Sequence, residues 1–157
     1  MEARIGIKTD NLSETAHLLS KILADEFILY TKTLNAHWNV EGDNFYQMHM
    51  FYDEQYGQLE TIIDKVAERV RALGHYAPAT LKLFLELTHF TETTRDENNG
   101  NGFIKELLAD HEVIIIHLRE NIKQIDNEFH DAGTTDFITD LLKTHEKMAW
   151  MLRAHCK

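Results

Sequence analysis

Residues 37–70 read HWNVEGDNFYQMHMFYDEQYGQLETIIDKVAERV, and their pattern is the strongest indication of the fold. Large apolar side chains recur in it at helical spacing, which places them on one face of an α-helix. They are Phe45, Met48, Tyr52, Leu59, Ile63, Val66 and Val70. Turn-forming residues stand at 42–44, and Gly74 follows the stretch. The pattern therefore predicts one long helix over residues 44–73, with its apolar face turned towards other helices.

Metal-binding side chains occupy a different flank of the same predicted helix. His49 and Asp53 are four residues apart, as are Asp64 and Glu68, so each pair points its two side chains the same way. At about 100° per residue, the four side chains lie roughly 80° to 180° away from Leu59 on the apolar face. Such a flank would face a neighbouring subunit. Each pair can hold one side of a metal site.

The two pairs are too far apart to close around one ion within a single chain. His49 and Asp64 are separated by roughly 22 Å along a helix that rises about 1.5 Å per residue. If the pairs form one site, the second pair comes from another copy of the helix, antiparallel across a two-fold axis. Gly57 lies between the pairs, where a glycine would let a partner helix approach closely. A glycine inside a helix otherwise costs roughly 1 kcal/mol relative to alanine.

Three further amphipathic runs predict long helices over residues 11–38, 103–128 and 135–155. A short apolar run at 79–85 predicts a small connecting helix, and the polar stretch 91–102 predicts a loop. Four long helices arranged in this way predict an all-α four-helix bundle, with a short extra helix in the connection between the second and third helices. That connection is long enough to run the length of the bundle.

Local signals suggest where the helices begin. Asn11, with Glu14 three residues later, predicts an N-cap for the first helix. The segment 133–135, Gly-Thr-Thr, predicts a chain break and an N-cap for the last one. We expect residues 1–157 to form one domain, with 1–10 as a short segment before the first helix.

The composition narrows the class of function. A formal net charge of −10 argues against a protein that works by neutralising phosphates, and it suits the attraction of cations. Residues 1–10 lack the charged and apolar regions of a signal peptide, and no apolar run approaches the roughly 20 residues needed to span a bilayer. We therefore expect a cytoplasmic protein with no membrane partner.

The histidines divide into two groups. Eight lack the carboxylate spacing seen around His49, and we interpret them as structural: His17, His75, His89, His111, His117, His130, His145 and His155. His37 and His49 remain, together with the three carboxylates. Imidazole and carboxylate without thiolate suit iron, manganese or zinc, and the carboxylates favour iron. The alternative interpretation is a solvated helix flank that binds no ion.

These motifs resemble those of the Dps family of mini-ferritins. The matching string is His37-Trp38-Asn39-Val40-Glu41-Gly42, then Phe45, His49 and Asp53, then Asp64, Glu68 and Arg69. The resemblance covers nearly the whole chain and implies a ferritin-like bundle with a di-iron ferroxidase centre between two subunits. It assigns His37, His49 and Asp53 to one subunit's side of the centre, and Asp64 and Glu68 to the side of its two-fold mate.

The resemblance also implies a function. The chain would oxidise Fe(II) to Fe(III), with hydrogen peroxide as the favoured oxidant, and store ferric oxide inside a hollow homododecamer. Zinc accepts the same ligands and is a possible substitute for iron. Trp38 is similar to the family's tryptophan beside the centre, where it would act as a redox-active or shielding ring. The alternative interpretation of Trp38 is a core aromatic at the end of the first helix.

Three aspartates near the start of the last helix form a second feature. They are Asp131, Asp136 and Asp140. Carboxylates in a first helical turn are stabilised by the helix dipole, which is the plain structural explanation. The pattern is also similar to the aspartates that line the three-fold iron pore of Dps proteins, where three copies would attract Fe(II).

The chain departs from many Dps proteins in one respect. Those that bind DNA carry lysine-rich or arginine-rich tails, whereas residues 1–10 contain only Arg4 and Lys8 as basic residues. We expect DNA binding to be weak or absent. The alternatives are a DNA-binding Dps that protects the nucleoid, a di-iron enzyme acting on an organic substrate, and a non-catalytic structural bundle.

Overall fold

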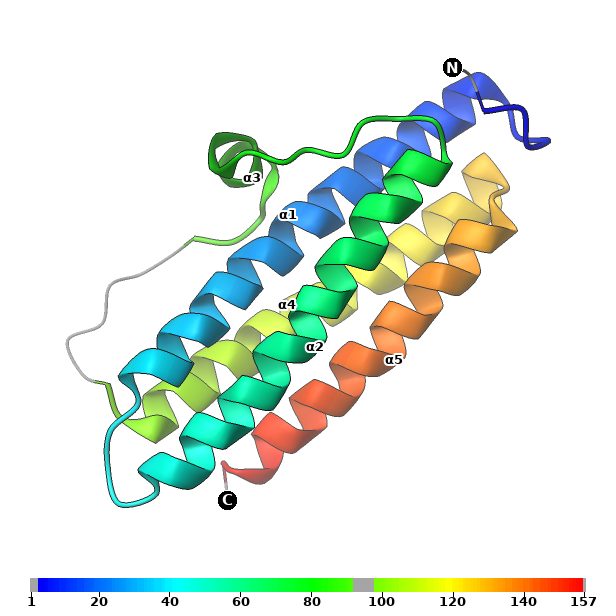
Figure 1. Ribbon diagram of the computed structural model, residues 1–157. Coiled ribbons are helices and arrows are strands. Elements are labelled where there is room, and N and C mark those ends of the chain that lie inside the picture. The colour runs from blue at the N-terminus through cyan, green and yellow to red at the C-terminus, as the bar shows by residue number, and fades with distance from the viewer. Residues whose placement is uncertain (1–2, 92–97, 157) are drawn as a thin grey trace.

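The computed structural model describes residues 3–91 and 98–156. Helices account for most of this part of the chain, and their order is easily followed in Figure 1. The helices are α1 (Thr9–Asn39), α2 (Phe45–Ala72), α3 (Leu81–Leu87), α4 (Gly100–Gln124), the π-helical turn η1 (Ile125–Phe129) and α5 (Ala132–Ala154).

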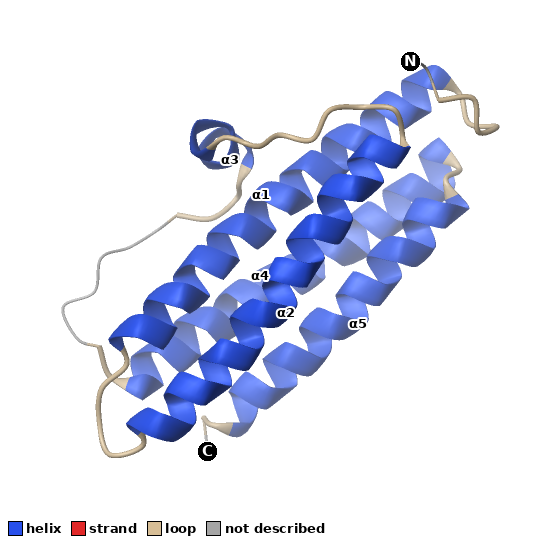
Figure 2. Cartoon of the chain, in the orientation of Figure 1, coloured by secondary structure: helices blue, strands red, loops and turns tan. Residues whose placement is uncertain are grey.

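The four long helices of the described ranges lie side by side as a bundle. α1 and α2 run antiparallel, and so do α4 and α5, whereas α2 and α4 run parallel (Figures 1 and 2). The connection between α2 and α4 therefore has to return along the bundle, and it carries α3 on the way, beside α1. The predicted all-α bundle with a short extra helix in this connection is confirmed.

The apolar face predicted for α2 is largely confirmed. Met48, Tyr52, Leu59, Val66 and Val70 are buried in the core. The two exceptions lie on the margin of the face: Ile63 is half-buried, and Phe45 is 46% exposed. Phe45 is the first residue of α2 and stacks on His49 one turn later, with ring centroids 5.2 Å apart. It therefore covers a metal-ligand candidate rather than filling the core.

The helix ends differ from the sequence prediction. α1 begins at Thr9, and the Asn11 side chain donates to the carbonyl oxygen of Phe129 instead of capping the helix. α5 begins three residues early because Asp131, which precedes the predicted segment 133–135, accepts from the backbone N–H of Thr134 as the N-cap. α4 starts at Gly100, inside the predicted 91–102 loop, of which residues 92–97 lie outside the described residues.

The returning connection is held on α1 by specific contacts. The Thr80 side chain accepts from the N–H of Leu83 and so caps α3. The ring of Phe84 in α3 stacks on that of Phe27 in α1, with centroids 4.5 Å apart. Asp25 of α1 then binds the residues that follow α3, as described below. Within residues 3–91 and 98–156, no helix has the length and hydrophobicity needed to cross a membrane.

Candidate metal centre

Two histidines fix each other's orientation where α1 ends and α2 begins. The Nδ1–H of His37 donates to the carbonyl oxygen of His49 at 2.8 Å, and the Nδ1–H of His49 donates to the carbonyl oxygen of His37 at 2.8 Å. The two rings stack with centroids 3.8 Å apart. Because Nδ1 carries the proton of each neutral ring, Nε2 of each ring keeps a lone pair for a metal ion.

Asp53 brings a carboxylate to the two rings. Its Oδ1 lies 4.0 Å from Nε2 of His37. The Tyr56 hydroxyl donates to the same oxygen at 2.7 Å. That hydrogen bond is the largest cause of a raised pKa for Tyr56, followed by desolvation and the charge of Asp53. The phenol therefore keeps its proton and orients the carboxylate. His37, His49 and Asp53 therefore lie where they could serve as ligands on one side of a metal site, and we call them the histidine-rich half-site.

Asp64 and Glu68 lie elsewhere on the same helix. α2 continues unbroken from Phe45 to Ala72, so Asp64 is roughly 16 Å beyond Asp53 at about 1.5 Å per residue. Both Asp64 and Glu68 are exposed. Each chain therefore presents a histidine-rich half-site at one end of α2 and a carboxylate pair towards the other, and its own geometry keeps them apart.

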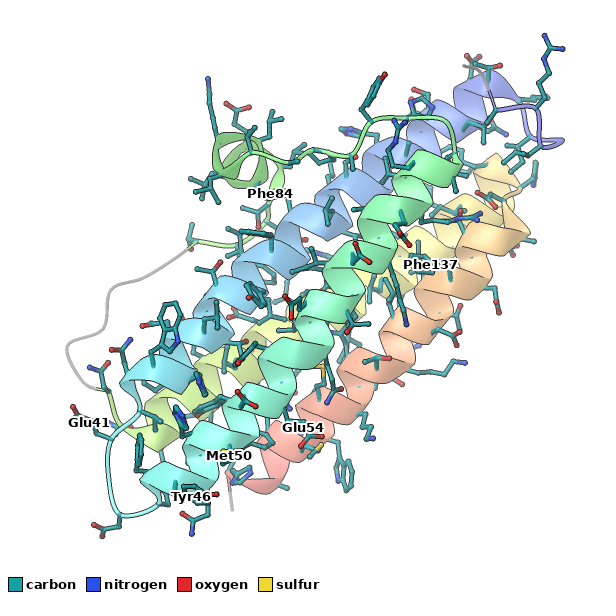
Figure 3. The ribbon with its side chains drawn as sticks, viewed as in Figure 1. Glu41, Tyr46, Met50, Glu54, Phe84 and Phe137 are labelled. Carbon is teal, nitrogen blue, oxygen red and sulfur yellow. The ribbon has the colours of Figure 1, made fainter. Side chains whose placement is uncertain are left out.

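Large apolar side chains are exposed around the histidine-rich half-site. Trp38 is 67% exposed, Tyr46 69% and Met50 47%, and Figure 3 labels the last two on the start of α2. The interpretation of Trp38 as a core aromatic is therefore wrong for this chain. A cluster of exposed aromatic and methionine side chains is typical of a surface that another protein covers.

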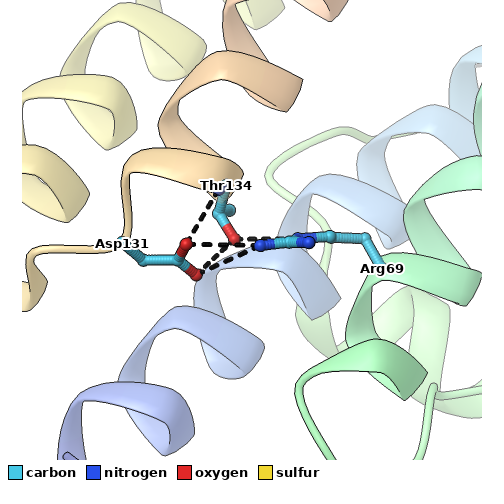
Figure 4. A network of polar contacts seen from close by, with 3 residues as sticks. All are labelled: Arg69, Asp131 and Thr134. Atoms are coloured by element: carbon cyan, nitrogen blue, oxygen red, sulfur yellow. Dashed lines mark hydrogen bonds and ion pairs between the residues drawn. The ribbon is translucent and has the colours of Figure 1, made fainter. Parts of the chain in front are cut away.

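The three aspartates near α5 differ in their surroundings. Asp131 is 2% exposed, and it accepts hydrogen bonds from Thr134 and from Nη2 of Arg69 at the end of α2, as Figure 4 shows. Its carboxylate therefore joins α5 to α2. Asp136 and Asp140 are both exposed, and Asp140 pairs with Lys143 at 2.7 Å. Asp136 therefore presents its negative charge to solvent, Asp140 is exposed but paired with a lysine, and Asp131 is buried.

A buried polar network that the sequence did not predict lies in the middle of the bundle. His111 and His145 face each other, with their Nδ1 atoms 2.9 Å apart, and Nε2 of His145 lies 2.8 Å from Oε1 of Glu26. All three residues are 0% exposed. A signal was present: Glu26 falls at helical spacing among the apolar residues of α1, on the face that must be buried.

Fold and half-site together define a ferritin-like protein, and the comparisons agree. The ferritin-like domain family matches residues 16–157. The chain is 39% identical, over 96% of its length and 84% of the relative, to a low temperature-induced protein of Nostoc sp.. It is 33% identical to DNA protection during starvation protein 2 of Bacillus anthracis, covering 90% of this chain and 95% of that one.

A solved structure shows which group of ferritin-like proteins the chain resembles. The Dps protein of Vibrio cholerae O1, described as a member of a broad superfamily of ferritin-like diiron-carboxylate proteins, superposes with a TM-score of 0.93 at 28% identity. The alignment covers 99% of this chain and 97% of that one. The chain belongs to the Dps family of mini-ferritins.

Proposed function

We propose that this chain is a ferroxidase and iron-storage protein whose active centre is shared by two subunits. His37, His49 and Asp53 form one wall of the centre, and the partner subunit's Asp64 and the partner subunit's Glu68 form the other. The observation that supports this most is the pair of reciprocal Nδ1–H bonds, which leave both imidazoles ready to ligate through Nε2. The separation of the two half-sites along α2 gives the reason for the second subunit.

Iron is the substrate at this centre. Two Fe(II) ions bound side by side would give one electron each to one molecule of hydrogen peroxide, whose O–O bond breaks. The two hydroxides that result take up two protons from solvent and leave as water, or stay with Fe(III) in the ferric oxide. Paired transfer avoids the one-electron reduction of peroxide that releases hydroxyl radical. The imidazoles and carboxylates suit this reaction because they bind both iron oxidation states, and the carboxylates favour Fe(III). Peroxide is our proposed oxidant, in preference to dioxygen.

The proposed assembly is a hollow homododecamer that stores the ferric product. The exposed aromatic and methionine side chains around His37 support burial against another copy. Asp136 and Asp140, exposed at the start of α5, would attract Fe(II) towards a three-fold opening. Asp131 would contribute by holding that end of α5 in place, because its own carboxylate is already paired with Arg69.

Protection of DNA would be indirect in this proposal. The net charge of −10 disfavours phosphate binding, so removal of iron and peroxide, rather than contact, would protect nucleic acid. A tight, salt-resistant shift of a DNA fragment would contradict this and favour a nucleoid-binding role. A cytoplasmic location stays a prediction.

The test is anaerobic addition of Fe(II) to the purified protein, followed by peroxide, with ferric absorbance and hydroxyl-radical trapping measured together. For the wild type we expect the ferric absorbance to rise quickly, with no hydroxyl radical trapped. Glu68→Gln should oxidise iron slowly and release radical while the assembly stays intact. Glu14→Gln, which alters an exposed carboxylate of α1, is the matched control and should behave as the wild type. Equal rates in all three proteins would rule out the proposed centre.

A further inference from the structure

A second group of metal-ligand side chains lies away from the proposed ferroxidase centre. Asp25 of α1, His89 of the connection after α3, and His117 of α4 meet at a surface pocket of about 160 Å³. One ligand atom from each lies within 4.8 Å of the other two. Among residues 3–91 and 98–156, no other histidine, cysteine, aspartate or glutamate side chains gather in threes this closely.

We propose that Asp25, His89 and His117 bind a divalent transition-metal ion of the Zn²⁺ class. Two imidazoles and one carboxylate are a ligand set that such ions prefer, with one further position left for water. Glu120, three residues after His117 on α4, also lines the pocket, as does Lys21 of opposite charge. The site shares no residue with the ferroxidase centre, and the proposal does not depend on that function.

The carboxylate is already oriented for this role. Oδ1 of Asp25 accepts from the Thr88 hydroxyl at 2.8 Å and from the backbone N–H of His89 at 2.7 Å. Oδ2 is the oxygen that meets the His89 ring, with Nδ1 at 2.9 Å. Asp25 itself is 4% exposed, and the two hydrogen bonds to its Oδ1, one from a side chain and one from the backbone, hold it in one position. Hydrogen bonds of this kind, made to a ligand side chain by its neighbours, hold that side chain in the orientation in which it binds a metal.

The histidines can complete the set with small movements. A tetrahedral ion with bonds of about 2.1 Å spaces its ligands by roughly 3.4 Å. The present separations are 2.9 Å between Oδ2 of Asp25 and Nδ1 of His89, and no more than 4.8 Å for the other pairs. The His89 side chain is 45% exposed and can turn, and its ring centroid is 4.5 Å from that of His117. The ion would take the place of the proton that Asp25 and His89 share.

A simple ion pair explains only part of this arrangement. Contact between Asp25 and His89 would suffice to hold the connection on α1, with no metal. It leaves His117 unexplained, because its Nδ1 is buried with no hydrogen-bond partner among the described residues. A half-buried imidazole whose shielded Nδ1 lies beside a histidine–carboxylate pair is accounted for by an ion that all three bind.

Binding would join three segments that are distant in sequence. α1, the connection and α4 would be linked by one ion, at the point where the connection leaves α3. The ion would therefore hold the connection on the bundle more firmly than the present hydrogen bonds do.

The test uses Co²⁺ as a spectroscopic probe and Zn²⁺ in calorimetric titration, both with full-length, metal-free protein. To disable both walls of the other centre, the measurements are made in a His49→Ala, Asp53→Asn, Asp64→Asn, Glu68→Gln background. We expect about one equivalent per chain, visible Co²⁺ absorption of a four- or five-coordinate site, and a higher Tm with Zn²⁺. Loss of a hydrogen bond to a metal ligand typically weakens metal binding by about 10–100-fold. His117→Ala removes a ligand itself, so it should weaken binding by more than this. His17→Ala, an exposed histidine of α1, is the matched control.

Other outcomes would overturn the proposal. Unchanged binding in His117→Ala would mean that the ions sit at scattered surface groups, as would absence of the Co²⁺ spectrum in the parent protein. If His117→Ala folds poorly by circular dichroism, His89→Ala carries the same test, since that ring is largely at the surface. In the chain that retains both walls of the ferroxidase centre, His117→Ala should leave iron oxidation unchanged, which separates this proposal from the proposed function.

Discussion

Tyr56 is a positioning residue for the proposed centre, since it reaches the metal only through Asp53. Tyr56→Phe removes the hydrogen bond at 2.7 Å and frees the carboxylate to rotate. Loss of such an outer contact should lower the iron affinity and the oxidation rate by about 10–100-fold, with the fold intact. Stopped-flow iron oxidation measures this. Tyr76→Phe, at a ring 88% exposed, should have no effect.

A titration separates this role from mere packing. Since the hydrogen bond to Asp53 is the largest cause of the raised pKa of Tyr56, Asp53→Ala should return that pKa towards 10.0. Ultraviolet difference spectra of tyrosinate follow the change. A Tyr56 pKa that does not move in Asp53→Ala would show that Asp53 and Tyr56 are not coupled.

His111 makes the folded protein sensitive to acid. Burial lowers its pKa well below 6.5, and the neighbouring His145 lowers it further. Below about pH 6.5 the imidazole therefore becomes protonated in the unfolded chain but stays neutral in the folded chain. This difference favours the unfolded chain, so the folded protein is fully stable above that pH and loses stability as the pH falls below it. The loss is about 1.4 kcal/mol per pH unit for one group. Urea unfolding between pH 5 and 7.5 should show this slope, and His111→Gln should reduce it by up to about that amount.

At the level of the helices, substitutions of Asp131 and Asp136 should have different effects: the first should lower the stability of the fold, and the second should slow the attraction of Fe(II). Asp131→Ala removes the cap of α5 and leaves Arg69 without its carboxylate, which should cost about 2–4 kcal/mol of unfolding free energy. Asp136→Ala should change stability by less than about 0.5 kcal/mol but slow iron uptake, because its charge faces solvent. Denaturant unfolding and iron-uptake kinetics measure the two effects. Equal losses of stability would mean that Asp136 also has a structural partner.

The helices themselves were predictable because their signals are local. The apolar periods fixed α1, α2, α4 and α5 to within a few residues, and the i, i+4 pairs placed His49 and Asp53 together. The reciprocal bonds between His37 and His49 were not predictable, since they depend on how the turn between α1 and α2 closes. The same is true of Asp25, His89 and His117, which are up to 92 residues apart and meet only after the connection folds back.

At the scale of the whole molecule, Gly57 tests the proposed two-fold interface. Nothing lies within 4 Å of the position its Cβ would take, so a side chain there has room in the isolated chain. Gly57→Leu should therefore leave the helix intact but hold the partner's α2 away, giving smaller assemblies and slow iron oxidation. Light scattering after size-exclusion chromatography gives the mass. Ser13→Leu, at an exposed position of α1, is the control, and normal assembly of Gly57→Leu would place the interface elsewhere.

The division of α2 into two half-sites has a genetic consequence under the proposed arrangement. A chain lacking His37 and His49 and a chain lacking Asp64 and Glu68 are each inactive alone, because every centre in either homodimer has a broken wall. When the two are coexpressed, each mixed dimer contains one centre with both walls defective and one with both intact. Two recessive alleles would thus complement each other within a single particle, and a cell carrying both would recover part of its iron oxidation.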